Sequence, residues 1–188
     1  MHHNRTILPV IIGILIGALL CTGCLASEEP VVPQVANSET ASPELAWITT
    51  SMTNVATGER FTIKDLAELG KPVIIHSFAI WCPGCSMQLL ESTKLQTAYP
   101  DSYTVVALDV DPNDNLDKVK RHQESNKFKG IFTATPTDAT RSLINAYGPG
   151  FIQSIPQTII ICGKTATYLE DGVFSADTLK RAADELCS

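Results

Sequence analysis

The sequence predicts an α/β fold in which a central mixed sheet carries helices on both faces. Residues 72–80 (PVIIHSFAI) and 102–110 (SYTVVALDV) are nearly continuous apolar runs, typical of strands buried on both faces. A helix-like segment follows each run, and this alternation indicates parallel strands joined by crossovers. Residues 156–162 and 165–171 are strand-like runs around a Gly-Lys turn, which predicts an additional antiparallel pair.

The N-terminal part predicts a leader followed by a spacer. Residues 1–23 form a signal or anchor segment, with Arg5 ahead of an apolar run at 7–20 that is short for a membrane span. Residues 24–44 are rich in Pro, Ser and Glu without an apolar period, which predicts a flexible spacer. Residues 45–188 then form one domain.

The domain begins with a predicted β-hairpin, because residues 47–53 are rich in β-branched side chains and residues 54–60 contain a glycine turn. Thr62 precedes Asp65 by three residues, which is the spacing of a reciprocal cap at the start of a short helix. Residues 130–136 fit either a short strand or a loop. Further helices are expected at residues 83–98, 115–126, 138–148 and 176–187, the last one capped by Ser175.

Charge and composition exclude two classes of function. The net charge of −6 argues against a nucleic-acid partner. Residues 109–117 (DVDPNDNLD) superficially suggest a calcium loop, but they lack the glycine at position six and the distal glutamate. We therefore expect no bound metal ion.

Two of the six cysteines, Cys82 and Cys85, directly follow the buried strand at 72–80. Cys82 takes the predicted N-cap of the next helix, and Pro83 takes the first helical position, where a missing N–H costs nothing. The positive end of that helix favours an anion at Cys82 and lowers the pKa of its thiol. A thiolate of low pKa attacks disulfides and also leaves readily, so the pair is suited to thiol–disulfide exchange.

Two simpler interpretations of the pair are weaker. A zinc site needs two more ligands, and Cys162, Cys187, His76 and His122 show no metal-binding spacing. A purely structural disulfide across two residues closes almost no loop and stabilises little.

The segments FAIWCPGC (78–85) after VIIHS (73–77), and SIPQT (154–158) ahead of a strand, resemble the thioredoxin fold. More narrowly, they are similar to the membrane-tethered TlpA/ResA-type thiol–disulfide oxidoreductases. The resemblance covers about residue 44 to the C-terminus. It implies a three-layer thioredoxin-like fold with an extra N-terminal β-hairpin, protein thiol and disulfide substrates, and no cofactor.

The resemblance also implies roles for individual residues. Cys82 becomes the nucleophile and Cys85 the resolving cysteine. Trp81 lies beside the pair, and Pro156 corresponds to a cis proline next to it. A cis X–Pro bond exposes the main chain of Ile155 to an extended substrate strand.

His76 lies six residues before Cys82, where thioredoxins place a buried acid and many tethered relatives an asparagine. Two interpretations stay open. The imidazole is either a proton relay for Cys85 or a core histidine that hydrogen-bonds to backbone.

Cys162 ends the strand after Pro156, and Cys187 ends the last helix. In a thioredoxin-like fold both elements run away from the Cys82–Cys85 pair and cover similar lengths. The two residues therefore form either a structural disulfide or two separate thiols.

The segment CTGC (21–24) resembles a lipoprotein signal site, with Cys24 as the lipidated residue. It departs from the usual pattern at Cys21, where such sites carry leucine, so an uncleaved N-terminal anchor is the alternative. In both cases the domain is extracytoplasmic and attached to the membrane.

The family resemblance implies a reductant of protein disulfides, with cytochrome c maturation as one setting and a membrane electron-transfer protein as its electron donor. An oxidase of the same fold is the close alternative, since the residues between the cysteines do not fix the direction. A tethered metallochaperone that binds copper or zinc through Cys82 and Cys85 is the alternative from another class.

Overall fold

The computed structural model describes residues 45–169 and 172–188. The predicted leader, the lipidation candidate Cys24 and the predicted spacer lie outside the described residues. Seven strands are described: β1 Met52–Thr53, β2 Arg60–Phe61, β3 Val73–Phe78, β4 Thr104–Asp109, β5 Ile131–Ala134, β6 Gln157–Cys162 and β7 Thr165–Leu169. Seven helices accompany them: α1 Ala46–Thr49, α2 Ile63–Glu68, α3 Pro83–Ala98, α4 Leu116–Asn126, α5 Thr137–Tyr147, α6 Gly150–Gln153 and α7 Ala176–Leu186.

Five of the strands form one mixed sheet in the order β5-β4-β3-β6-β7, and β1 and β2 form a separate antiparallel ribbon. β3 is parallel to β4 and antiparallel to β6. This central position explains why all six residues of β3 are buried. The predicted mixed sheet and the predicted N-terminal hairpin are both confirmed.

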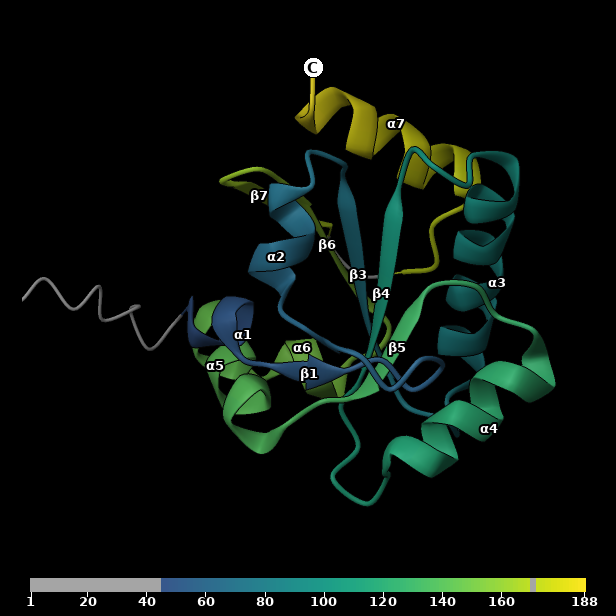
Figure 1. Cartoon of the computed structure of the whole chain (residues 1–188), viewed down its shortest axis with the longest axis vertical. Helices are drawn as coiled ribbons and strands as arrows, with labels where there is room; N and C mark the ends of the chain where they lie inside the picture. The colour runs from purple at the N-terminus through teal and green to yellow at the C-terminus, as the bar shows by residue number, and fades with distance from the viewer. Residues whose placement is uncertain (1–44, 170–171) are drawn as a thin grey trace, which may run out of the picture. The chain divides into compact units, whose positions relative to one another are not determined.

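Alternate residues of the central strands point to two separate cores. Val73 and Ile75 pack with α1, α2, α5 and α6 on one face of the sheet, whereas Ile74 and Phe78 pack with α3, α4 and α7 on the other. Figure 1 shows α3 and α4 on the right of the sheet and α1 and α5 on the left. Three layers result, and α3 begins where β3 ends.

The local signals in the sequence place most helix starts correctly. Thr62 and Asp65 form the reciprocal cap of α2, and the side chain of Ser175 accepts a hydrogen bond from the backbone N–H of Thr178 at the start of α7. Residues 131–134 are a strand, which resolves the alternative of a strand or a loop.

Two single-turn helices differ from the sequence expectation. Residues 47–53 were expected to be extended, but residues 46–49 form α1, because Trp47 is buried and its backbone N–H donates to Ser142 Oγ of α5 at 3.1 Å. Phe151 likewise fills the core from α6 just after Gly148 ends α5. In both cases a long-range contact outweighs the weak local preference.

Among the described residues, no helix is both long and apolar enough to cross a membrane.

Candidate active site

Cys82 and Cys85 form a disulfide at the start of α3, with their Cα atoms 5.2 Å apart. Cys82 is the N-cap residue, and its Sγ accepts a hydrogen bond from the backbone N–H of Cys85 at 3.1 Å. Cys82 is 6% exposed, whereas Cys85 is fully buried. Cys82 therefore presents the sulfur that another molecule can reach.

The N-terminus of α3 supplies positive potential to Cys82. This helix runs for 16 residues, and its first turn contains no acidic side chain. The unpaired backbone N–H groups of a helix start carry partial positive charge, and one of them already points at Cys82 Sγ. A helix start of this kind stabilises negative charge on a sulfur at its N-cap.

A second segment meets the pair at the Ile155–Pro156 peptide bond, which is cis. The carbonyl oxygen of Ile155 lies 3.8 Å from Cys82 Sγ. A Cβ atom added at Gly84 would lie 3.6 Å from Pro156 Cδ, so Gly84 faces that proline. The N–H of Gln157 donates to Ser77 Oγ at 3.1 Å, which holds this segment against the end of β3.

Trp81 stands next to the pair and is 66% exposed. Its indole N–H donates to Asp111 Oδ2 at 2.6 Å. Hydrogen bonds from the Asn113 backbone and from Trp81 hold the pKa of Asp111 below its usual range. A cleft of about 190 Å³ lies here, lined by Ala79, Trp81, Val110, Asp111, Pro112, Ile152 and Ile155.

Asp109 is a buried acid at the end of β4 that the sequence reasoning missed. It is 1% exposed, and its Oδ1 accepts a hydrogen bond from the Asp111 backbone at 2.9 Å. Its Oδ2 is buried without a hydrogen-bond partner among the described residues. Burial raises the pKa of Asp109 to about 7. The signal in the sequence was an acidic residue inside an otherwise apolar strand.

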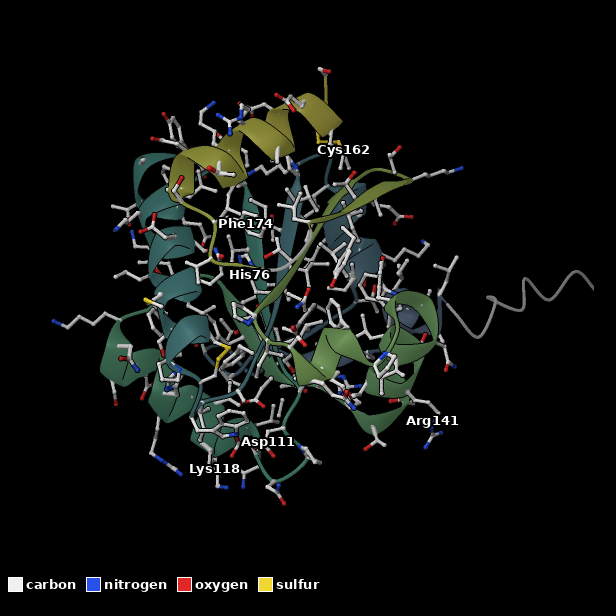
Figure 2. The ribbon with its side chains drawn as sticks, turned by 180° about the vertical axis from the view of Figure 1, so that it is seen from behind. His76, Asp111, Lys118, Arg141, Cys162 and Phe174 are labelled. Carbon is white, nitrogen blue, oxygen red and sulfur yellow. A yellow bond between two sulfur atoms is a disulfide. The ribbon has the colours of Figure 1, made fainter. Side chains whose placement is uncertain are left out.

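His76 is fully buried in β3 (Figure 2). Its Nδ1 lies 2.9 Å from Thr158 Oγ1, and its Nε2 lies 2.7 Å from Ser92 Oγ. Burial lowers the pKa of His76 to about 3, so the ring is neutral at physiological pH. Ser92 is two helical turns beyond Cys85 on α3. The ring therefore hydrogen-bonds two hydroxyls, whereas the core-histidine interpretation placed backbone groups there.

Cys162 and Cys187 also form a disulfide, with Cα atoms 5.6 Å apart. It joins the end of β6 to the C-cap of α7. Figure 2 shows Cys162 at the opposite end of the domain from the Cys82–Cys85 bond. Four of the six cysteines thus form two disulfides within the described residues, and the two bonds lie in different parts of the domain.

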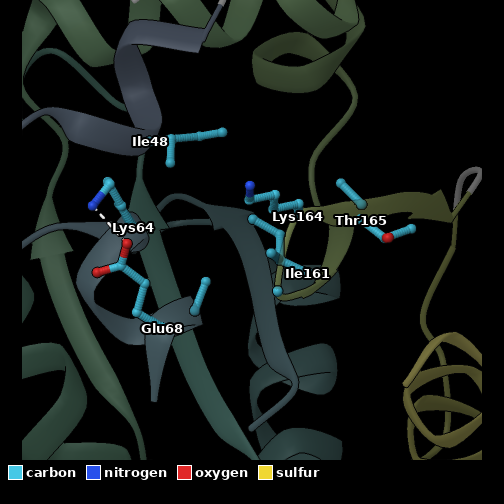
Figure 3. A pocket seen from close by; sticks show the side chains of 9 residues that line it. Ile48, Lys64, Glu68, Ile161, Lys164 and Thr165 are labelled. Atoms are coloured by element: carbon cyan, nitrogen blue, oxygen red, sulfur yellow. Dashed lines mark hydrogen bonds and ion pairs between the residues drawn. The ribbon is translucent and has the colours of Figure 1, made fainter. Parts of the chain in front are cut away.

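A separate cavity of about 440 Å³ lies between α1, α2 and the turn after β6 (Figure 3). Ile48 and Ile161 form part of its apolar wall, and Lys64 pairs with Glu68 at 2.6 Å on its rim. It is at the Cys162 end of β6, away from the reactive pair. Within the described ranges, no three or more His, Cys, Asp or Glu side chains are grouped so as to hold a metal ion.

A disulfide across two residues, at the helix start that follows the central strand of a thioredoxin-like fold, defines a thiol–disulfide oxidoreductase. The chain belongs to the AhpC/TSA family, which it matches over residues 47–165.

Solved structures of similar fold support the assignment of the fold. A thiol:disulfide interchange protein of the thioredoxin family from Chlorobium tepidum is 23% identical, with a TM-score of 0.63 over 74% of this chain and 93% of that one. A secreted Mycobacterium tuberculosis disulfide oxidoreductase, described as homologous to E. coli DsbE, is 16% identical, with a TM-score of 0.59 over 75% and 98%. The pneumococcal exposed lipoprotein thioredoxin Etrx1 is 19% identical, with a TM-score of 0.58 over 73% and 98%.

Proposed function

We propose that this protein reduces disulfides of exported proteins, with Cys82 as the nucleophile and Cys85 as the resolving cysteine. The difference in position of the two sulfurs carries the proposal. Cys82 keeps 6% of its surface exposed at the helix start, whereas Cys85 is 0% exposed behind it. A substrate can therefore reach Cys82 Sγ first.

The reaction begins with both cysteines reduced. The Cys82 thiolate attacks one sulfur of the substrate disulfide, that S–S bond breaks, and the departing substrate thiolate takes up a proton. Cys85 then loses its proton and attacks Cys82 Sγ. The mixed disulfide breaks, and the second substrate thiolate leaves and is protonated. Two electrons have passed to the substrate, and the Cys82–Cys85 disulfide seen here remains.

The hydrogen bond from the Cys85 backbone N–H to Cys82 Sγ supports the first step in both directions. It stabilises negative charge on Cys82 before the first attack. It also stabilises the same charge when Cys82 becomes a leaving group in the reverse direction. A membrane electron-transfer protein with its own dithiol returns the two electrons in this proposal.

The substrate strand binds along Ile155 in this proposal. The Ile155 carbonyl is within 3.8 Å of Cys82 Sγ, so an extended peptide paired with this main chain brings its own cysteine to the reactive sulfur. The exposed ring of Trp81 lines the same cleft as Ile155 and supplies apolar contact to the substrate there.

We place the domain outside the cytoplasm, attached through Cys24 or an uncleaved anchor. The Cys162–Cys187 disulfide supports an oxidising compartment. Two proteins of similar fold are described as secreted or as an exposed lipoprotein. A role in cytochrome c maturation is proposed from the family resemblance.

The reduction potential of the Cys82–Cys85 pair tests the direction of the reaction. We expect a reduction potential of about −270 mV, as in thioredoxin, because such a value makes the protein a reductant. A value near about −120 mV would instead assign the disulfide-forming role. The measurement uses the C162S/C187S double variant, so that only one disulfide of the domain titrates.

A further inference from the structure

A concentrated basic segment begins within α4 and continues just beyond its end. Residues 118–129 contain five of the fourteen Lys and Arg residues of a chain whose net charge is −6, and only one acidic residue, Glu124. The basic residues are Lys118, Lys120, Arg121, Lys127 and Lys129. The local charge is therefore opposite to that of the protein as a whole.

Most of these cations are not neutralised by neighbours. Lys118 pairs with Asp114 at 3.2 Å. Lys120, Arg121, Lys127 and Lys129 are exposed, and none of their side chains forms an ion pair within the described ranges. Their charge is therefore available to a partner.

The cations of α4 adjoin the loop that leads to Cys82. Lys118, Arg121, His122 and Ser125 recur at the spacing of one helical face. Together with Ile80 and Asn126 they line an open depression of about 380 Å³. Ile80 is two residues before Cys82 and packs against the apolar cluster that contains both cysteines. Figure 2 shows Lys118 at the same end of the domain as the Cys82–Cys85 bond.

We propose that this face of α4, on which Lys118 and Arg121 lie, binds an acidic segment of the protein substrate beside its reactive cysteine. The inference rests on the proposed function. An unpaired cation such as Arg121, next to the loop that leads to Cys82, attracts an acidic partner and raises its rate of encounter, and salt weakens this attraction.

Three disulfide-linked peptides test the proposal. They share one sequence around the cysteine and differ only in flanking residues, which are Glu, Gln or Lys. The reduced full-length protein is mixed with each peptide at low salt and at high salt, and kcat/KM is measured. We expect the acidic peptide to be reduced about tenfold faster than the neutral one at low salt, with the difference lost at high salt.

Matched charge reversals locate the effect. Arg121→Glu is expected to abolish the preference for the acidic peptide. Arg141→Glu changes the net charge equally but lies on α5, on the other face of the sheet (Figure 2), and is expected to keep the preference. Far-UV circular dichroism shows whether both variants are folded.

The outcomes separate this inference from the function on which it rests. Failure to reduce any of the three peptides would contradict the proposed reductant activity itself. Equal rates for all three at low salt, a preference for the basic peptide, or equal losses in the two variants would overturn the acidic docking surface while leaving that activity intact.

Discussion

The carbonyl oxygen of Ile155 lies 3.8 Å from the sulfur of Cys82, although the two residues are 73 positions apart in the sequence. The end of β3 and the segment before β6 meet because these two strands are antiparallel neighbours in the sheet. A backbone edge that can bind a peptide is thus fixed beside a sulfur that can attack it. The positions of the two cysteines relative to this edge lead to the first prediction.

The order of attack predicts different behaviour of two single variants. Cys85→Ser keeps the cysteine with the greater exposure and removes the fully buried one, so it should accumulate a covalent mixed disulfide with substrate. Cys82→Ser should form little of this species, because Cys85 is fully buried. Non-reducing electrophoresis with mass spectrometry measures the adduct. Equal trapping by both variants would refute the assigned order.

Asp109 predicts a loss of stability as the pH rises. Its folded-state pKa of about 7 is above its unfolded value of 3.8, so between these values only the folded state holds the proton. Its contribution to the free energy of unfolding therefore falls from about pH 4 to pH 7.

Asp109→Asn removes this titration and keeps an acceptor for the Asp111 backbone N–H. Relative to the wild type, the variant should gain about 1–3 kcal/mol more at pH 8 than at pH 5 in urea denaturation. Comparing the two proteins at each pH cancels contributions from other titrating groups. A difference that does not vary with pH would show that Asp109 has an ordinary pKa.

His76 predicts a loss of stability as the pH falls, opposite to the effect of Asp109. Its folded-state pKa of about 3 is below its unfolded value of 6.5, so only the unfolded state takes up the proton between these values. Its contribution to stability is complete above pH 6.5 and is lost as the pH falls towards 3.

His76→Asn should flatten this acid loss, because an amide can still bond to Ser92 and Thr158 without titrating. Urea denaturation at several pH values between 4 and 7 measures the change. The same variant separates the two interpretations of His76. An unshifted pH profile of thiol oxidation is expected for a core histidine, whereas a shifted profile would assign it the proton relay.

The Cys162–Cys187 disulfide is expected to stabilise the domain without taking part in exchange. Its 25-residue separation predicts a loss of roughly 3 kcal/mol in the C162S/C187S double variant, measured as the free energy of unfolding. The rate of substrate reduction should stay unchanged, because this bond lies at the opposite end of the domain. A loss of activity in a variant that remains folded would connect the second disulfide with the reaction.

Features that depend on neighbouring residues were predicted well from the sequence. The strand–Cys–Pro–helix junction placed Cys82 at the N-cap, and the Thr62–Asp65 spacing placed the start of α2, because both are local backbone effects. The two central strands were recognisable because burial on both faces leaves no polar positions to interrupt the apolar runs.

Two features that depend on distant residues were not predicted. The hydroxyl partners of His76 come from positions 16 and 82 residues away, and no local pattern identifies them. The same holds for the hydrogen bond between Trp81 and Asp111, which depends on how the loop after β4 passes the loop after β3. Asp111 had been considered only as part of the rejected calcium-loop pattern at residues 109–117.

The two disulfides lie near opposite ends of β6, and this has a practical consequence for measurements on the protein. Dithiothreitol that opens both bonds releases four thiols from the described domain, so a simple thiol count mixes two independent two-electron couples. Alkylation of each cysteine, followed by peptide mapping, assigns every released thiol to its own bond.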